Sequence, residues 1–185
     1  MPFIGRKPTD APLTSSDITD GIIVTADIAD AQITSAKLAS GVGGKVLQVV
    51  NVTKTDTFST TSSSYTDVTD LSASITPGST SNKIYVVLSI YVSGNTQTGN
   101  YYCNIVRTAT QLQETVVRIP QEDQAVYRLY NLSMTDFDSP SSTSSLTYKA
   151  QVKTNAGTMY VNRASNQGGF SETATATLTL MEIAG

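Results

Sequence analysis

The sequence contains no histidine and no tryptophan, and cysteine occurs once, at Cys103. Without histidine, Ser-His-Asp and Cys-His mechanisms are excluded, because both need an imidazole as the base. One cysteine excludes a disulfide within the chain and argues against a zinc site. Cys103 lies in the alternating run NYYCNIVRT, so we expect a small core residue and not a nucleophile. We expect no metal and no cofactor.

Charge is also sparse. Charged residues make up 15% of the chain, and the net charge is −3. No basic patch or run is present, which argues against a nucleic-acid partner. No apolar run is long enough to span a membrane, and the opening MPFIGRKPTD lacks the apolar core of a secretory signal. We therefore expect neither membrane insertion nor secretion by a signal peptide.

Paired carboxylates are the one enzymatic option left, as in glycosidases. Glu122 with Asp123 and Asp136 with Asp138 are the close pairs. Both flank expected turns, where acidic residues are ordinary surface residues. The sequence therefore predicts that the protein is not an enzyme.

An aliphatic residue recurs at every fifth position between residues 11 and 40, and a small residue precedes each by two positions. The aliphatic residues are Leu13, Ile18, Ile23, Ile28, Ile33 and Leu38, and the small ones are Ala11, Ser16, Gly21, Ala26, Ala31 and Ala36. On an α-helix this spacing steps about 140° around the axis and makes no stripe, and on a flat strand it alternates between faces. An interior on one side therefore needs a backbone bend about once per repeat.

These pentads resemble the pentapeptide-repeat solenoid, in which a small residue is followed by Asp or Asn and then by an aliphatic residue. Asp17-Ile18 and Asp27-Ile28 fit that pattern, and Gln32 and Lys37 fit it less well. Six pentads are too few for a solenoid that is stable alone, and ordering the segment costs more than burying its aliphatic residues returns. We expect the pentads to assemble with copies of themselves; the alternative is a disordered linker that happens to be periodic.

Four segments follow one another along the chain. Residues 1–10 are an irregular arm, residues 11–40 are the pentad stalk, residues 41–44 are a glycine joint, and residues 45–185 are a β domain. Glycine at the joint permits a sharp change of direction. The fold class expected is all-β, with an intertwined trimeric stalk followed by an antiparallel β-sandwich or jelly-roll knob.

The β domain contains eight or nine expected strands and no convincing helix. The segment 83–94 alternates strictly and should be a central strand, and Asn155-Ala156-Gly157 is expected to be a hairpin turn. The strand-like segments are 45–55, 65–76, 83–94, 100–108, 111–119, 125–137, 145–154, 158–164 and 173–185.

Nine tyrosines are present, and most lie in expected strands, so we expect most of them to pack inside the sandwich or between subunits. Four residues in or beside Gly-, Asn- and Gln-rich loops are instead candidates for ligand contact: Tyr101, Arg163, Asn166 and Phe170.

The run DITDGIIVTADIADAQITSAKLAS resembles the repeats of tail fibres of tailed bacteriophages, notably those of cyanobacterial and marine hosts. The stretch from VLQVVNVTKT to SNKIYV and the ending LTLMEIAG resemble the β domain that follows such repeats. The resemblance implies a homotrimeric virion protein. Its N-terminal part, with Pro2, Phe3 and Ile4, would attach to a tail adaptor, baseplate or capsid. Its knob would face outward and adsorb to a host-surface glycan.

Two alternatives stay open. The chain is short for a fibre, so a head fibre or capsid decoration protein without a receptor role also fits. A carbohydrate-binding module or glycan hydrolase is the alternative from another functional class.

Overall fold

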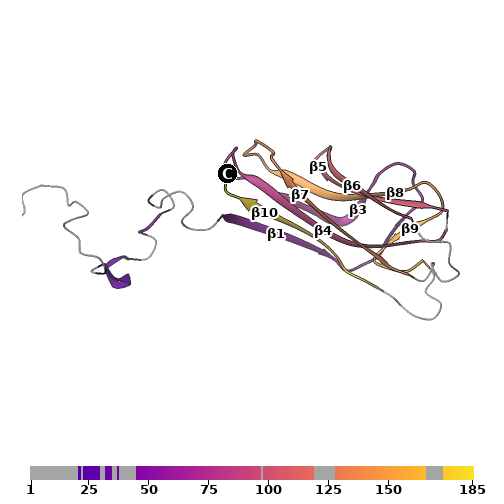
Figure 1. Cartoon of the computed structure of the whole chain (residues 1–185), viewed down its shortest axis with the longest axis horizontal. Helices are drawn as coiled ribbons and strands as arrows, with labels where there is room; N and C mark the ends of the chain where they lie inside the picture. The colour runs from indigo at the N-terminus through magenta and orange to yellow at the C-terminus, as the bar shows by residue number, and fades with distance from the viewer. Residues whose placement is uncertain are drawn as a thin grey trace, which may run out of the picture. The chain divides into compact units, whose positions relative to one another are not determined.

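The computed structural model describes residues 21, 23–29, 32–34, 37, 45–96, 98–118, 128–165 and 173–185. The chain divides into two units, Met1–Gly44 and Lys45–Gly185. The described part of the first unit includes a single turn of 3-10 helix, η2 (Thr25–Asp27). The described part of the second consists of antiparallel strands joined by loops (Figure 1).

Every segment expected to be a strand contains one. The strands are β1 (Val46–Lys54), β2 (Phe58–Thr60), β3 (Thr66–Ile75), β4 (Lys83–Gly94), β5 (Asn100–Arg107), β6 (Thr110–Arg118), β7 (Tyr130–Asp138), β8 (Leu146–Thr154), β9 (Met159–Val161) and β10 (Ala176–Ile183). The three-residue β2 was not expected. The segment 125–137 was expected to begin before β7, but its first residues lie outside those described.

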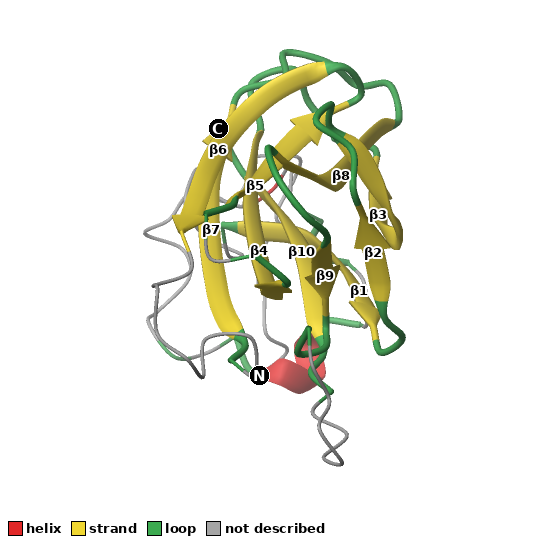
Figure 2. Ribbon diagram, turned by 90° about the vertical axis from the view of Figure 1, so that its right-hand side faces the viewer, coloured by secondary structure: helices red, strands yellow, loops and turns green. Residues whose placement is uncertain are grey.

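Two antiparallel sheets pack as a sandwich (Figure 2). The first sheet contains six strands, which pair in the order β1-β10-β4-β9-β2, and β7 pairs with β4 on the side opposite β10. The second sheet contains four strands in the order β3-β8-β5-β6. Setting aside the short β2 and β9, eight long strands remain, of which the first (β1) pairs the last (β10) and the second (β3) pairs the last but one (β8). The consecutive strands β5 and β6 pair within one sheet. This is the strand order of a jelly roll, and it confirms the expected fold of the knob.

The strand β4 lies at the centre of its sheet, as its alternation predicts. Its inward residues Ile84, Val86, Leu88, Ile90 and Val92 are all fully buried. Strand β10 pairs along one side of β4 and β7 along the other. Burying each such side chain stabilises the fold by about 1.5–3 kcal/mol, so this one strand anchors the core.

The turn at Asn155–Gly157 does not form the expected hairpin. Strands β8 and β9, which it joins, belong to different sheets, so the turn carries the chain across the sandwich. Gly157 has a φ of 68°, and a Cβ there would lie 2.4 Å from the Asn95 Oδ1. The sequence predicts the turn correctly, but its partner strands are set by packing between distant segments.

Candidate interaction surfaces

A backbone hydrogen bond recurs at the five-residue period in the described part of the pentad segment. The amide of Asp27 donates to the Val24 carbonyl (2.9 Å), that of Gln32 to Ala29 (3.2 Å) and that of Lys37 to Thr34 (2.9 Å). The donors and the acceptors are each five residues apart. Each bond closes a turn between residues i and i+3, so the bend that a one-sided interior requires is present in these repeats.

The aliphatic residues described in this segment face solvent in the single chain. Ile23 is 52% exposed, Ile28 is 38% exposed and Ile33 is 50% exposed. Two polar groups nearby are satisfied locally, because the Asp27 carboxylate accepts a hydrogen bond from the Val24 amide (2.9 Å). The other expected oligomerisation residues, Leu13, Ile18 and Leu38, and the expected attachment residues, Pro2, Phe3 and Ile4, lie outside the described residues.

The prediction that Tyr101 contacts a ligand is wrong. Its side chain is fully buried in the core, and its ring lies against Gly94, where a Cβ would come within 1.9 Å. The hydroxyl donates to the Thr96 carbonyl (2.9 Å) and accepts from the Thr96 amide (3.2 Å). Burial raises the pKa of the hydroxyl. The glycine-rich loop before Tyr101 indicates, from sequence, an exposed side chain. In the structure, the missing side chains of Gly94 and Gly99 leave space for the buried ring.

Arg163 lies at the partly exposed end of the sandwich beside β9. Its guanidinium carbon is 4.2 Å from the centre of the Tyr160 ring, a cation–π arrangement, and its carbonyl accepts from the Ser93 hydroxyl (2.7 Å). A ligand contact for Arg163 stays a prediction. Asn166 and Phe170, the other two candidates of this loop, lie outside the described residues.

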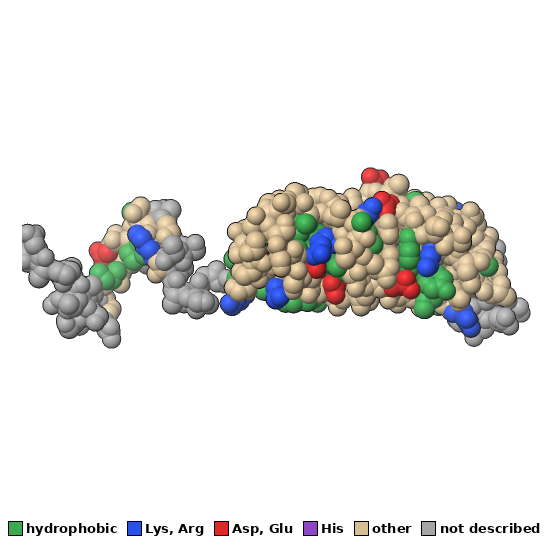
Figure 3. All heavy atoms as spheres, turned by 90° about the horizontal axis from the view of Figure 1, so that it is seen from above, with side chains coloured by type: hydrophobic (Ala, Val, Ile, Leu, Met, Phe, Trp, Pro, Cys, Tyr) green, Lys and Arg blue, Asp and Glu red, His purple; other side chains and the backbone are tan. Residues whose placement is uncertain are grey.

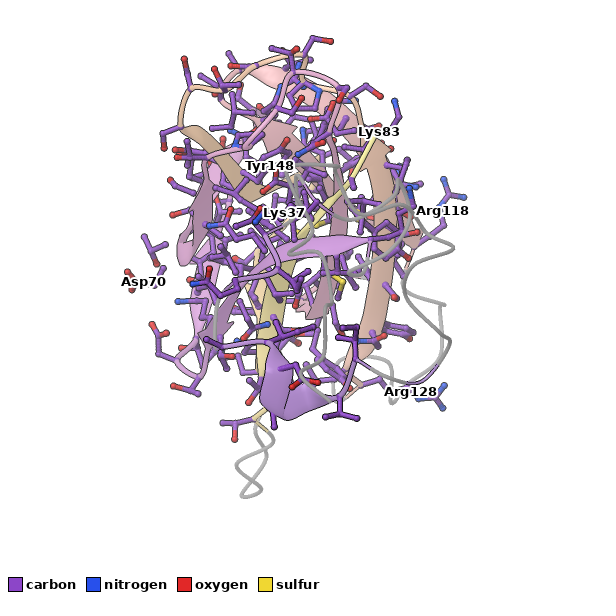
Figure 4. All side chains as sticks on the ribbon, turned by 90° about the vertical axis from the view of Figure 1, so that its left-hand side faces the viewer. Lys37, Asp70, Lys83, Arg118, Arg128 and Tyr148 are labelled. Carbon is purple, nitrogen blue, oxygen red and sulfur yellow. The ribbon has the colours of Figure 1, made fainter. Side chains whose placement is uncertain are left out.

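Asp138 is a buried carboxylate and not the surface turn residue that its sequence position indicates. Both of its oxygens accept from Arg107 Nη1 (2.7 and 2.6 Å), and Oδ2 also accepts from the Tyr148 hydroxyl (2.6 Å). Desolvation and the carboxylate raise the pKa of Tyr148. Tyr148 points into the sandwich, whereas Asp70 and Arg118 project away from it (Figure 4). This cluster joins β5, β7 and β8 and so links the two sheets.

Two charged side chains on the outer face of the four-stranded sheet, Asp67 and Lys149, pair with each other. Lys149 Nζ lies 2.6 Å from Asp67 Oδ2, and Gln151 donates to Asp67 Oδ1 (2.6 Å). These hydrogen bonds, that of Lys149 foremost, hold the pKa of Asp67 below its ordinary value. On the face seen in Figure 3, basic and acidic side chains are interspersed and form no patch of one sign.

Two tyrosines on the same outer face surround a lysine. Lys153 Nζ lies 4.3 Å from the centre of the Tyr65 ring and 4.7 Å from that of Tyr102. The Tyr65 hydroxyl donates to the Glu114 carboxylate, and burial raises the pKa of that hydroxyl. The tyrosine faces are thus occupied by a cation of the protein itself.

The one cysteine of the sequence lies in the core. Cys103 is buried, as its strand pattern predicts, and burial raises the pKa of its thiol to about 12. Over the described ranges, no three His, Cys, Asp or Glu side chains gather as metal ligands would. Nor does this part of the chain include a helix long and apolar enough to cross a membrane.

The strand order places the second unit in the class of jelly-roll domains. No protein-family model matches the sequence, and no curated protein matches it. Among solved structures, the PRD1 vertex protein P5 is similar at 14% identity with a TM-score of 0.44, over 76% of this chain and 100% of that one. A VP2 subviral particle protein of infectious bursal disease virus is similar at 13% identity with a TM-score of 0.40, over 75% of this chain and 37% of that one. At these identities the likeness concerns the outline of the fold alone.

Proposed function

We propose that this protein is a structural virion protein of a tailed bacteriophage, a short trimeric tail fibre. Its pentads bind three chains together, its N-terminal arm attaches to the particle, and its jelly-roll knob is presented to a host-surface glycan. No catalytic step belongs to this role. The observation that carries the proposal is the run of solvent-exposed isoleucines, Ile23, Ile28 and Ile33, at one turn per repeat.

The physical argument rests on what a single chain leaves unburied. A regular series of exposed aliphatic side chains is unfavourable in water, because removing apolar surface from water lowers the free energy. A second copy with the same period can bury these side chains. Solenoid-like repeats become stable by stacking on neighbours. The knob already has its own core, so the pentads and not the knob require assembly. The resemblance of the pentads to fibre repeats supports the virion assignment.

Sedimentation equilibrium of the full chain tests the assembly. The wild type should have three times the 19.6 kDa mass of one chain. Replacing Ile28 and Ile33 with serine should give a monomer, because the buried contacts are lost. Replacing Gln32 and Lys37 with serine introduces as many serines but keeps the aliphatic residues, and should leave the trimer intact. A monomeric wild type at micromolar concentration contradicts the proposal.

Gold-labelled antibody on intact particles tests the location. Label at the tail supports the tail fibre, and label confined to heads replaces it with a capsid decoration or head-fibre role. Competition of host adsorption by the purified full chain tests the receptor role separately. A protein that labels tails but does not slow adsorption would be structural without binding the host.

A further inference from the structure

One outer face of the knob contains no charged residue in three successive cross-strand rows. The rows run across β1, β10, β4 and β7, and neighbouring residues within each are paired in the sheet. We call these positions the charge-free face: Val49, Met181, Tyr85 and Phe137; Asn51, Thr179, Val87 and Thr135; Thr53, Thr177, Ser89 and Ser133. In a chain of which 15% is charged, the face differs from the rest of the knob surface.

The first of these rows is apolar and open to solvent. Val49 is 56% exposed and Phe137 is 54% exposed, and the ring of Phe137 lies 6.1 Å from that of Tyr85. Val46 and Leu47, at the start of β1, are 51% and 53% exposed and enlarge the apolar end. A contiguous exposed apolar patch of this kind marks an interaction site more often than a solvated surface.

The outer face of the other sheet provides the contrast. It includes Asp67, Lys149, Lys153 and Glu114, and each of these charges has a partner within the chain. A face that contains several charged side chains suits contact with water, because interface cores are depleted of charge. The two outer faces of the knob therefore differ in charge content. An interface in an assembly is depleted of charged residues relative to the solvated surface in the same way.

We infer that the charge-free face packs against the same face of the neighbouring copies, around the axis of the trimer proposed above, on which this inference rests. A neutral face meets its own copy without repulsion between like charges. The twelve positions offer apolar groups at one end and hydroxyl and amide groups at the other. At the polar end, the Asn51 amide donates to the Thr179 hydroxyl (2.7 Å) and the Thr53 hydroxyl donates to Asn51 Oδ1 (3.2 Å), so these three side chains already bond one another.

The position of the apolar end along the chain supports a second copy as the occupant. It begins at Val46, and the glycine joint of residues 41–44 can span at most about 14 Å. Chains held together by their pentads therefore keep these faces at an effective concentration of the order of millimolar. The twelve positions are fewer than the roughly 20–30 residues that each partner contributes to a stable interface, so the face would associate only with the pentads in place.

Single-cysteine cross-linking of the full chain tests the inference. Val49→Cys places a thiol on the charge-free face, and Val116→Cys is the matched control. Val116 lies on the outer face of the other sheet, also on an edge strand and at 52% exposure. Cys103 is buried and should not react. With a short bismaleimide, V49C should give at least tenfold more covalent dimer than V116C.

Charge substitution gives a second readout. Val49→Asp should keep the trimeric mass, because the pentads hold the chains, but should lower the thermal midpoint by about 4 °C relative to Val116→Asp. Equal cross-linking of V49C and V116C in a trimeric protein, or equal midpoints of the two aspartate variants, overturns this inference and leaves the proposed function standing. A monomeric wild type overturns both.

Discussion

Asp138 shows how one side chain can join the two sheets. It lies at the end of β7 and accepts hydrogen bonds from Arg107 on β5 and Tyr148 on β8. Asp138 is 8% exposed and Arg107 is 21% exposed in their side chains. Removing one member of such a pair leaves the other charge and a buried hydroxyl without partners, which costs more than the pair itself contributes.

Asp138→Ala should therefore lower the free energy of unfolding by about 3 kcal/mol, measured by urea denaturation of the full chain. Asp67→Ala is the control, because it also breaks an aspartate–cation pair, Asp67–Lys149, but at a carboxylate that is 52% exposed. That change should cost no more than about 1 kcal/mol. Equal losses in the two variants would show that burial of the Asp138 cluster contributes nothing to stability.

Asp67 should also give stability a dependence on acid pH. The hydrogen bonds from Lys149 and Gln151 lower its pKa in the folded protein below the ordinary 3.8. A depressed folded pKa stabilises the protein above the unfolded pKa, and this contribution is lost as pH falls through the folded value. Since the carboxylate is half exposed, it is worth less than about 1 kcal/mol.

The measurement is the thermal midpoint of the wild type and of Asp67→Asn between neutral pH and about pH 2. The wild type should be the more stable at neutral pH, and the difference should close below pH 3.8, where the carboxylate becomes protonated. A difference that stays constant down to the lowest pH would mean that the Asp67 carboxylate charge is not its source.

At the scale of elements, alternation of apolar and polar residues predicted most strands correctly. In β4, the inward positions Ile84 to Val92 are all buried because the period of a strand is two. The strand β2 escaped prediction because three residues, Phe58–Thr60, are too few to show a period. The β5–β6 turn likewise has no glycine or asparagine signal, although Thr108 adopts a φ of 54°.

The sequence predicted which segments form strands better than it predicted which strands pair with each other. The sequence could not show that β8 and β9 lie in different sheets, because that choice depends on contacts between distant strands. The same limit explains Tyr101 and Asp138, which lie beside loop residues in sequence and in the core in space. The sequence shows that these residues of the charge-free face are uncharged, but it does not show that they are neighbours. The register of the four strands places them side by side in rows.

At the scale of the whole molecule, the two units have different requirements. The knob has a complete core, whereas the described isoleucines of the pentads have none. The five-residue period predicted the repeated bend, which the structure contains, whereas the assembly of the pentads with other copies stays a prediction. The symmetry of that assembly depends on contacts between chains, which the period of one chain does not specify.

The length of the glycine joint should control how strongly the knobs associate. Inserting eight Gly and Ser residues after Gly44 takes the joint from the four residues 41–44 to about three times that length. Effective concentration falls with the −3/2 power of tether length, so V49C cross-linking should drop roughly fivefold while the trimeric mass is unchanged. The same insertion after Thr143, in an exposed loop of the knob, should change neither. Undiminished cross-linking with the long joint would mean that the knobs associate without help from the pentads.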